Sequence, residues 1–342
     1  MAVLGGQSKD LGRGETNART PGRSGKGTMH GMTAQPIDGN ALAKALREQI
    51  AERARRLADR GASVRLDAVL VESGDNGARV YAENQARTCA SLGIEYRLHL
   101  LPATSGFDDI AGRVMLLSAD ESVSAIMVHM PLPGGVDPYR IQRLIAPEKD
   151  VEGVNPANIG NVVYGRSSLA PCTGLAVVKM AQTVFGPPRP VLGEHAPAQG
   201  WLAGKVAVVV GASDVVGKPI AVLLMRQDAT VISCNKWTPA LPEIARSADL
   251  LVSAAGKAGL ITADMVKPGA VVIDVGVNRV PGPGGKMRTV GDVVFETVSR
   301  IASHLSPVPG GVGPVTVSML LHNVVEAAER RSGLLAASTP SN

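Results

Sequence analysis

A glycine-bounded turn is the part of the sequence best suited to chemistry. The motif Gly211-x-Ser213-x-x-x-Gly217-x-Pro219 follows the apolar, β-branched run 206–210 and precedes an apolar helical segment. A strand, a Gly-rich turn and a helix N-terminus together bind phosphate, because the backbone approaches closely and the helix offers unpaired N–H groups. The spacing differs from G-x-G-x-x-G, so an ordinary tight strand–helix connection is an equal alternative to a nucleotide site.

The segment after the next strand-like run, residues 229–233, bears on the choice of cofactor. In a dinucleotide fold an Asp or Glu at this strand end selects NAD by contacting the adenosine ribose. The segment lacks a carboxylate and contains Lys236. A cation suits a 2′-phosphate and therefore indicates NADP, although a solvated loop lysine explains Lys236 nearly as well. Further strand-like runs at 249–254 and 270–274, each after a helical segment, complete the βαβαβ pattern of a Rossmann half.

The first half of the chain also alternates between strands and helices, which predicts an α/β fold with largely parallel sheets. Apolar periodicity predicts helices and strands in turn over residues 40–60, 65–71, 80–92, 95–101, 107–117 and 124–130. Residues 306–314 are too rich in Pro and Gly for a helix or a central strand, so they are a candidate ligand wall. The helix expected over 316–331 follows this loop and should return to the first domain.

Composition excludes several classes of protein. The 342 residues allow about two domains, and an aromatic content of 3% argues against stacking on nucleic-acid bases. Five basic and two acidic residues lie in the first 35, so most of the net charge of +5 belongs to that segment and gives no indication of nucleic-acid binding. Residues 1–35 and 333–342 are expected to be disordered tails.

The cysteines and the apolar runs bear on location. Cys89, Cys172 and Cys234 are far apart and show no metal-ligand spacing, so we expect no metal site and a reducing, cytoplasmic compartment. No apolar run approaches the ~20 residues of a membrane span. The first residues also lack the apolar core of a signal peptide.

Several short motifs between residues 36 and 331 occur together in one known enzyme family. They are Pro131-Leu-Pro133, Glu148-Lys-Asp-Val-Glu-Gly153, Pro171-Cys-Thr173, the Gly211–Pro219 turn, the segment 267–278, Val290-Gly-Asp292 and the segment 307–314. In this combination the chain resembles the bifunctional methylenetetrahydrofolate dehydrogenase/methenyltetrahydrofolate cyclohydrolase family, known in bacteria as FolD.

The resemblance implies an architecture and an activity. We expect an N-terminal α/β folate domain at 36–170, a Rossmann domain at 171–314 and a helix at 315–332 that packs on the first domain. The expected activity is NADP-dependent oxidation of 5,10-methylenetetrahydrofolate to the methenyl form in one-carbon metabolism, by a homodimer. The family also hydrolyses methenyl- to 10-formyltetrahydrofolate.

The resemblance also assigns cofactor contacts, to Gly211, Ala212, Ser213, Lys236 and Val277. The family usually has Arg at position 212 and often Ser at position 236. Ala212 therefore removes a cation that Lys236 would restore, and NAD stays open as an alternative to NADP. A purely structural role for Val277, packing the end of a strand, is an equally good interpretation.

The folate side departs further from the family. The resemblance assigns folate and catalytic contacts to Tyr81, Gln85, His129, Glu152, Pro309 and Gly310. The family has Lys at position 85, Gln at 129, Asp at 152 and Ser where this chain has Ala78. On a helix Tyr81 and Gln85 share a face. Neutral drift in a spare copy is an alternative explanation for the four changes.

These substitutions affect the two reactions differently. Hydride transfer needs positioned partners and no protein proton carrier, whereas hydrolysis moves protons, and Gln85 cannot titrate. We therefore predict that the dehydrogenase step is retained and that hydrolysis is weak or absent. Two alternatives remain: a bifunctional enzyme in which His129 replaces the lysine as acid–base, and a non-catalytic folate- or nucleotide-binding relative. A strand-end histidine satisfied by backbone is the other interpretation of His129.

Overall fold

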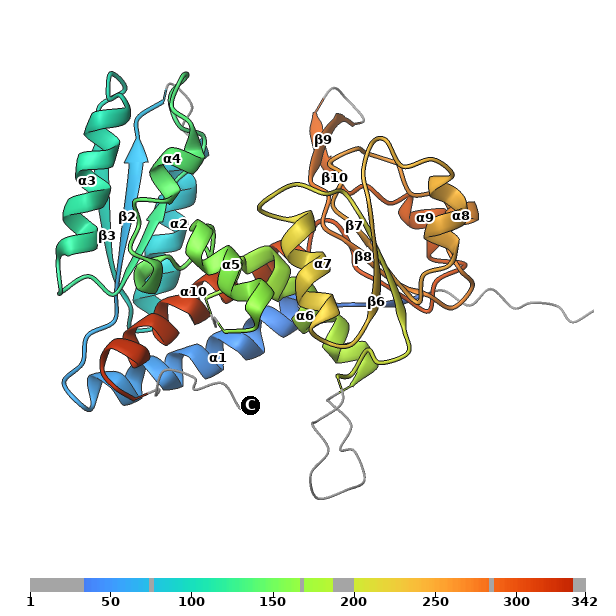
Figure 1. Ribbon diagram of the computed structural model, residues 1–342, viewed down its shortest axis with the longest axis horizontal. Coiled ribbons are helices and arrows are strands. Elements are labelled where there is room, and N and C mark those ends of the chain that lie inside the picture. Colours follow the sequence, from blue (N-terminus) through green and yellow to red (C-terminus); the bar gives the residue numbers. More distant parts are fainter. Residues whose placement is uncertain (1–33, 74–76, 167–168, 187–199, 283–285, 335–342) are drawn as a thin grey trace, which may run out of the picture. The chain divides into compact units, whose positions relative to one another are not determined.

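The computed structural model describes residues 34–73, 77–166, 169–186, 200–282 and 286–334 (Figure 1). Helices connect the strands of two mostly parallel sheets, which confirms the predicted α/β class. The strongest sequence patterns match their elements closely, since the strands predicted over 65–71, 95–101 and 206–210 have those bounds.

The smaller sheet belongs to the N-terminal half. Its strand order is β3-β2-β4, with β2 at Arg65–Val71, β3 at Glu95–Leu101 and β4 at Ala125–Val128, all parallel. The crossovers are α2 (Gly77–Ser91) and α3 (Phe107–Ala119). Every residue of the central strand β2 is buried, as expected for a parallel strand covered on both faces.

The larger sheet contains the Rossmann half. Its order is β1-β11-β8-β7-β5-β6, and every pairing within it is parallel. The predicted strands appear as β5 (Val206–Val210), β6 (Thr230–Cys234), β7 (Leu250–Ser253) and β8 (Val271–Asp274). The helices α7 (Gly217–Met225) and α8 (Leu241–Arg246) follow β5 and β6, so the predicted βαβαβ unit is confirmed.

Two short strands extend this sheet beyond the predicted unit. They are β1 (Gln35–Pro36) and β11 (His304–Leu305), which pair with each other, while β11 also pairs with β8. The expected disordered tail is therefore wrong at its last two residues, because Ala34 is buried and Gln35 is part of a strand. Residues 1–33 and 335–342 of the two expected tails lie outside the described residues.

The sequence patterns missed several short elements. These are α5 (Pro156–Tyr164), the 3-10 helices η1 (Pro147–Lys149) and η2 (Ala263–Met265), and the antiparallel strands β9 (Asn278–Pro281) and β10 (Met287–Val290). Two further short helices are α4 (Pro138–Gln142) and α9 (Phe295–Val298). None of the missed elements exceeds nine residues, too short for a clear period.

Three long helices pack together beside the smaller sheet (Figure 1). The last helix, α10 (Val312–Arg331), contacts α1 (Gly39–Ala58) and α6 (Cys172–Phe185), and it also touches β2 and β4. The predicted return of the last helix to the first domain is confirmed. The expectation that residues 306–314 contain no helix is wrong for the last three. Pro314 is the third residue of α10, where its missing N–H would have no helical partner anyway.

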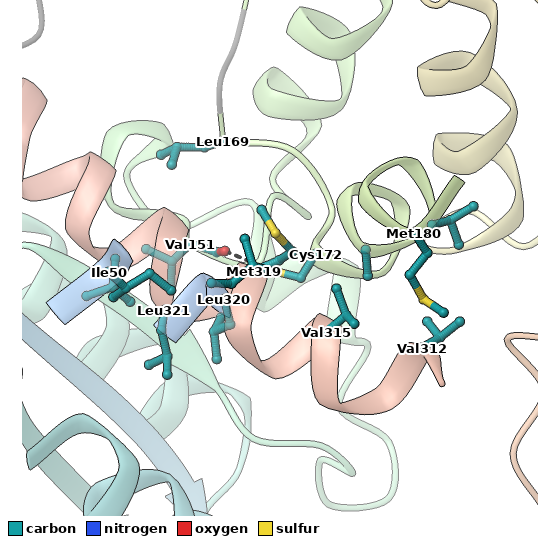
Figure 2. Packing of buried hydrophobic residues seen from close by; sticks show 14 of the residues in the cluster. Ile50, Val151, Leu169, Cys172, Met180, Val312, Val315, Met319, Leu320 and Leu321 are labelled. Atoms are coloured by element: carbon teal, nitrogen blue, oxygen red, sulfur yellow. Dashed lines mark hydrogen bonds between the residues drawn. The ribbon is translucent and has the colours of Figure 1, made fainter. Parts of the chain in front are cut away.

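Aliphatic side chains fill the core that joins these helices (Figure 2). Ile50, Met180, Val315 and Leu321 are almost fully buried there, and Val151 joins them from the segment before α5. The low aromatic content is thus offset by interdigitated Ile, Leu, Val and Met, each worth about 1.5–3 kcal/mol when fully buried. This core holds the segment around Val151 against α10.

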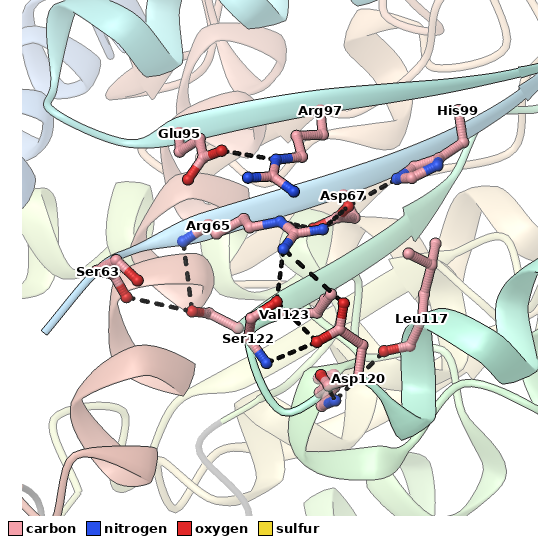
Figure 3. A network of polar contacts seen from close by, with 12 residues as sticks. Ser63, Arg65, Asp67, Glu95, Arg97, His99, Leu117, Asp120, Ser122 and Val123 are labelled. Carbon is pink, nitrogen blue, oxygen red and sulfur yellow. Dashed lines mark hydrogen bonds and ion pairs between the residues drawn. The ribbon is translucent and has the colours of Figure 1, made fainter.

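A polar network covers one end of the smaller sheet (Figure 3). Asp67 lies on the same face of β2 as Arg65, whose Nε is 2.7 Å from Asp67 Oδ2, and His99 Nε2 is 2.6 Å from Asp67 Oδ1. Arg65 also donates to Ser122 Oγ at 2.6 Å. Both charges are buried and paired, so removing either partner would cost about 3–5 kcal/mol. The network stabilises the sheet at the end opposite the candidate site.

Candidate active site

A cavity of about 680 Å³ lies at the carboxyl ends of β2 and β4, the edge at which open α/β sheets bind ligands. Tyr81, His129 and Glu152 line it from the N-terminal half. Val215 and Val216, from the glycine turn before α7, line it from the Rossmann half. Three of the six predicted folate residues and part of the predicted phosphate-binding turn therefore meet in one cavity.

The lining also contains residues that the sequence did not point to. These are Thr316, Val317 and Leu320 of α10, which form one wall beside Thr173 of the predicted Pro171-Cys-Thr173 motif. Pro309 and Gly310, expected on this wall, are not part of the lining. Their loop packs against the start of α1, where a side chain on Gly39 would lie 1.8 Å from Gly311 O. No periodic or motif signal marked the inner face of α10 as a ligand wall.

His129 follows β4 and is held by two contacts. Its backbone N–H donates to Val69 O at 2.8 Å, and its Nε2 lies 3.2 Å from the hydroxyl of Tyr96 on β3. The ring meets that of Tyr81 edge-on, with centroids 5.8 Å apart. Burial lowers the pKa of His129 to about 4, so the imidazole is neutral at physiological pH. A side chain this weakly basic is a poor replacement for the family's lysine.

Glu152 is the ionisable group of the cavity that titrates nearest neutrality. Its Oε2 accepts from the backbone N–H of Val128 at 3.4 Å, a long hydrogen bond. Burial, and secondarily the neighbouring charge of Asp150, raise the pKa of Glu152 to about 7. Burial also raises the pKa of Tyr81, so that phenol keeps its proton. The cavity therefore has one carboxyl group that changes charge near neutral pH.

Gln85 lies one helical turn beyond Tyr81 but outside the cavity lining. Tyr81 is 45% exposed whereas Gln85 is 3% exposed. Neither atom of the Gln85 amide has a hydrogen-bond partner among the described residues. An unpaired buried amide costs about 1–3 kcal/mol. Tyr81 and Gln85 were predicted to share a helix face, but only Tyr81 is part of the cavity wall.

The glycine turn is built by close backbone contacts. Gly211 has a φ of +112°, and a Cβ there would lie 2.2 Å from Ala254 O. A Cβ on Gly217 would lie 1.8 Å from Gly211 O, so both positions require glycine. Ser213 O accepts from the N–H of Lys218 at 3.0 Å. This tight entry into α7 fits a dinucleotide pyrophosphate, and the Ala212 methyl group leaves the turn without the family's arginine.

The end of β6 presents an exposed cation and an exposed aromatic ring. Lys236 Nζ lies 5.0 Å from the ring centroid of Trp237, which is 79% exposed. Asn235 shapes this loop by accepting from Trp237 N at 2.9 Å and donating its own N–H to Thr238 Oγ1 at 2.8 Å. Trp237, one of the two tryptophans in the chain, was not among the predicted cofactor contacts.

Two buried carboxylates hold the loops at the carboxyl edge of the larger sheet. Asp292 accepts from the successive backbone N–H groups of Ala255, Gly256 and Lys257 at 2.8–3.1 Å. Asp274 accepts from the backbone N–H groups of Asp292 and Gly276 at 3.0 and 2.9 Å. The family motifs around these residues therefore have a structural role here. They fix the turn that presents Val277, which is 71% exposed.

A second, largely apolar groove of about 960 Å³ adjoins the cavity. It lies among α4, α5 and α7, and it shares Met130, Val154 and Val215 with the cavity lining. This groove was not predicted, because one of its walls is α5, which was itself not predicted.

Within the described ranges, no cluster of three or more His, Cys, Asp or Glu side chains is placed to hold a metal ion. Among the helices that the structure describes, none combines the length and apolarity needed to cross a bilayer.

Comparison with known proteins identifies both halves. Residues 37–152 match the family described as tetrahydrofolate dehydrogenase/cyclohydrolase, catalytic domain, and residues 192–332 match its NAD(P)-binding domain. The chain is 44% identical over 302 residues to the bifunctional protein FolD of Cupriavidus pinatubonensis, covering 88% of this chain and 100% of that relative.

Solved structures agree with this assignment. The bifunctional FolD enzyme of Campylobacter jejuni superposes with a TM-score of 0.78 at 36% identity, covering 87% of this chain and 99% of that one. The Trypanosoma brucei dehydrogenase–cyclohydrolase, solved with NADP and an inhibitor, has a TM-score of 0.78 at 33% identity, covering 89% and 99%.

Proposed function

Because the chain belongs to the tetrahydrofolate dehydrogenase/cyclohydrolase family, we propose that it oxidises 5,10-methylenetetrahydrofolate to 5,10-methenyltetrahydrofolate with NADP. One observation carries the proposal: the valines of the glycine turn and the folate-side residues Tyr81 and Glu152 line the same cavity. The test is NADPH formation from methylenetetrahydrofolate by the purified protein. Failure to form NADPH at saturating cofactor would favour a non-catalytic binding protein.

The side chains of the cavity position the reactants. The nicotinamide, when bound, accepts the hydride, so no side chain has to move a proton in this step. Glu152, as a carboxylate, would accept hydrogen bonds from the amino group and ring N–H of the pterin. Tyr81 would pack against the pterin ring. Val215 and Val216 would hold the cofactor side of the cavity and exclude water, which the hydride step requires.

We propose that hydrolysis of the methenyl bridge is weak in this chain. Position 85 supplies no proton carrier, and Gln85 is outside the cavity lining. His129 supports the bifunctional alternative only weakly, because burial keeps it neutral and its Nε2 is directed at Tyr96. The measurement is loss of methenyl absorbance above the spontaneous rate.

Folate binding is expected to depend on pH through Glu152. Its folded pKa of about 7 means that the carboxylate needed for the pterin forms only as the pH rises through this value. KM for the folate should therefore fall from pH 6 to pH 8. Glu152→Gln should raise KM at pH 8 roughly 10- to 100-fold and remove this pH dependence. A pH-independent KM in the unmodified enzyme would contradict this account.

The same group has the opposite effect on stability. A carboxyl whose pKa is raised by folding destabilises the folded state as it ionises, between its ordinary pKa of 4.5 and about 7. Glu152→Gln removes this cost. The variant should therefore have a higher Tm than the unmodified enzyme at pH 8, and the difference should shrink at pH 5.

Lys236 is expected to set the preference for NADP. Its ammonium is placed at the strand end where the adenosine ribose binds in dinucleotide folds, and no acidic residue stands there. Lys236→Ala should raise KM for NADP roughly 10-fold and leave KM for NAD unchanged. Quenching of the exposed Trp237 provides a direct binding signal, because Trp201 is buried. Equal changes for both cofactors would show that Lys236 does not contact the 2′-phosphate.

We also propose that the enzyme is a homodimer. Strand β3 is at one end of the smaller sheet's order, and among the described residues no strand covers its outer side. Leu98 and Leu100 on this strand are 36% and 40% exposed. An apolar edge strand is suited to pairing with a second copy. Leu100→Lys should shift the mass measured by light scattering from dimer to monomer.

A further inference from the structure

The segment that carries Glu152 is held from behind by a buried amide on α10. Asn323 is fully buried, and its Nδ2 donates to Val151 O at 2.9 Å and to Ala170 O at 3.2 Å. We propose that Asn323 is a positioning residue for folate recognition, which sets the direction of Glu152 without touching the substrate. The inference rests on the proposed function, in which Glu152 accepts hydrogen bonds from the pterin.

The carbonyl group of Val151, directly before Glu152, accepts two hydrogen bonds. Val151 O accepts from the thiol of Cys172 at 3.2 Å (Figure 2). It also accepts from Asn323 Nδ2. Asn323 Nδ2 also lies 3.6 Å from Cys172 Sγ. One amide therefore connects the segment of Glu152 with the start of α6, and both segments line the cavity. The orientation of the 151–152 peptide is fixed by these contacts.

The residues around this peptide leave it little room to move. Gly153 has a φ of +68°, and a Cβ at this position would lie 2.3 Å from the carbonyl carbon of Ala170. On the other side, Asp150 accepts from Asn155 N at 2.7 Å. A change in the Val151 carbonyl would therefore be taken up at Glu152, whose carboxylate accepts a long hydrogen bond of 3.4 Å from Val128 N.

The chemistry of α10 supports this role for Asn323. The helix is otherwise packed by aliphatic residues at this level, including Leu321, Val324 and Val325. The Oδ1 atom of Asn323 has no hydrogen-bond partner in the described part of the chain. A leucine at this position would not bury an unpaired oxygen. The amide therefore contributes through its NH₂ group, which donates to the carbonyls of Val151 and Ala170.

The test compares Asn323→Leu, which removes the donors, with Ser318→Ala on the same helix. Ser318 is also fully buried, but its hydroxyl donates to Ala43 O at 3.3 Å and is not part of the cavity lining. Asn323→Leu should raise KM for methylenetetrahydrofolate at least 10-fold, with kcat and KM for NADP within threefold of the unmodified enzyme. Ser318→Ala should lower Tm and leave all three constants unchanged.

A second variant keeps the proposal testable if Asn323→Leu does not fold. Asn323→Ser retains one short donor, so its KM should lie between those of the unmodified enzyme and the leucine variant. If either folded variant has a reduced Tm and an unchanged folate KM, the role of Asn323 is structural only and the proposal is overturned. If the unmodified protein forms no NADPH in the same assay, the proposed function fails instead.

Discussion

Gln85→Lys should accelerate hydrolysis of methenyltetrahydrofolate roughly 10²–10⁴-fold over the unmodified protein, the usual contribution of a general acid–base. Gln85 itself is outside the cavity lining, but a lysine side chain is one atom longer and would extend its ammonium towards the cavity from a position that is 3% exposed, one helical turn beyond Tyr81. Burial lowers the pKa of a lysine and brings its titration towards neutral pH, where proton transfer is most effective. Hydride transfer should change only a few-fold, because it uses no proton carrier.

Gln85→Met is the matched control. It keeps the length of the side chain and removes both unpartnered amide atoms, so its Tm should equal or exceed that of the unmodified protein. It should not accelerate hydrolysis. The measurement for all three proteins is decay of methenyl absorbance, together with NADPH formation. Brisk hydrolysis by the unmodified protein, unaffected by His129→Ala, would disprove the claim that position 85 limits this activity.

Asp292→Ala should lower the free energy of unfolding by about 4 kcal/mol or more, because it leaves several buried donors without an acceptor. The carboxylate accepts from three successive backbone N–H groups, and its remaining donors are the side chains of Ser253 and Asn278, at 3.0 and 2.9 Å. These contacts hold the end of β7 and the segment after it against the start of β9. Loss of the acceptor should also weaken NADP binding at that edge.

Urea unfolding of Asp292→Ala, Asp292→Asn and Asp264→Ala measures how much of the lost stability comes from the buried donors that Asp292 satisfies. Asn keeps the shape of the side chain but turns an NH₂ group towards donors, so its cost should approach that of Ala. Asp264 is on the same domain and accepts from Thr262 Oγ1 at 2.6 Å, but it is exposed. Its loss should cost less than about 1 kcal/mol. Similar losses at Asp292 and Asp264 would show that the buried network contributes little.

Local sequence patterns predicted the fold well wherever the pattern was long. The strands at 65–71 and 206–210 have their expected bounds. In the second, a buried run of β-branched residues specifies a strand locally. Short elements such as α5 were missed for lack of a period. The start of α10 was placed too late, because a proline in the first helical turn was taken as a helix breaker.

For the site, the sequence alone determined the glycine turn, since the steric demands at Gly211 and Gly217 act over a few residues. It also identified Tyr81, His129 and Glu152, which the fold brings to one cavity. The tertiary structure alone decided that Gln85 is outside the lining and that α10 forms a wall. It also supplied Tyr96 as the partner of His129 and raised the pKa of Glu152 to about 7. Burial and partners depend on segments far apart in the chain, and therefore no local pattern contains them.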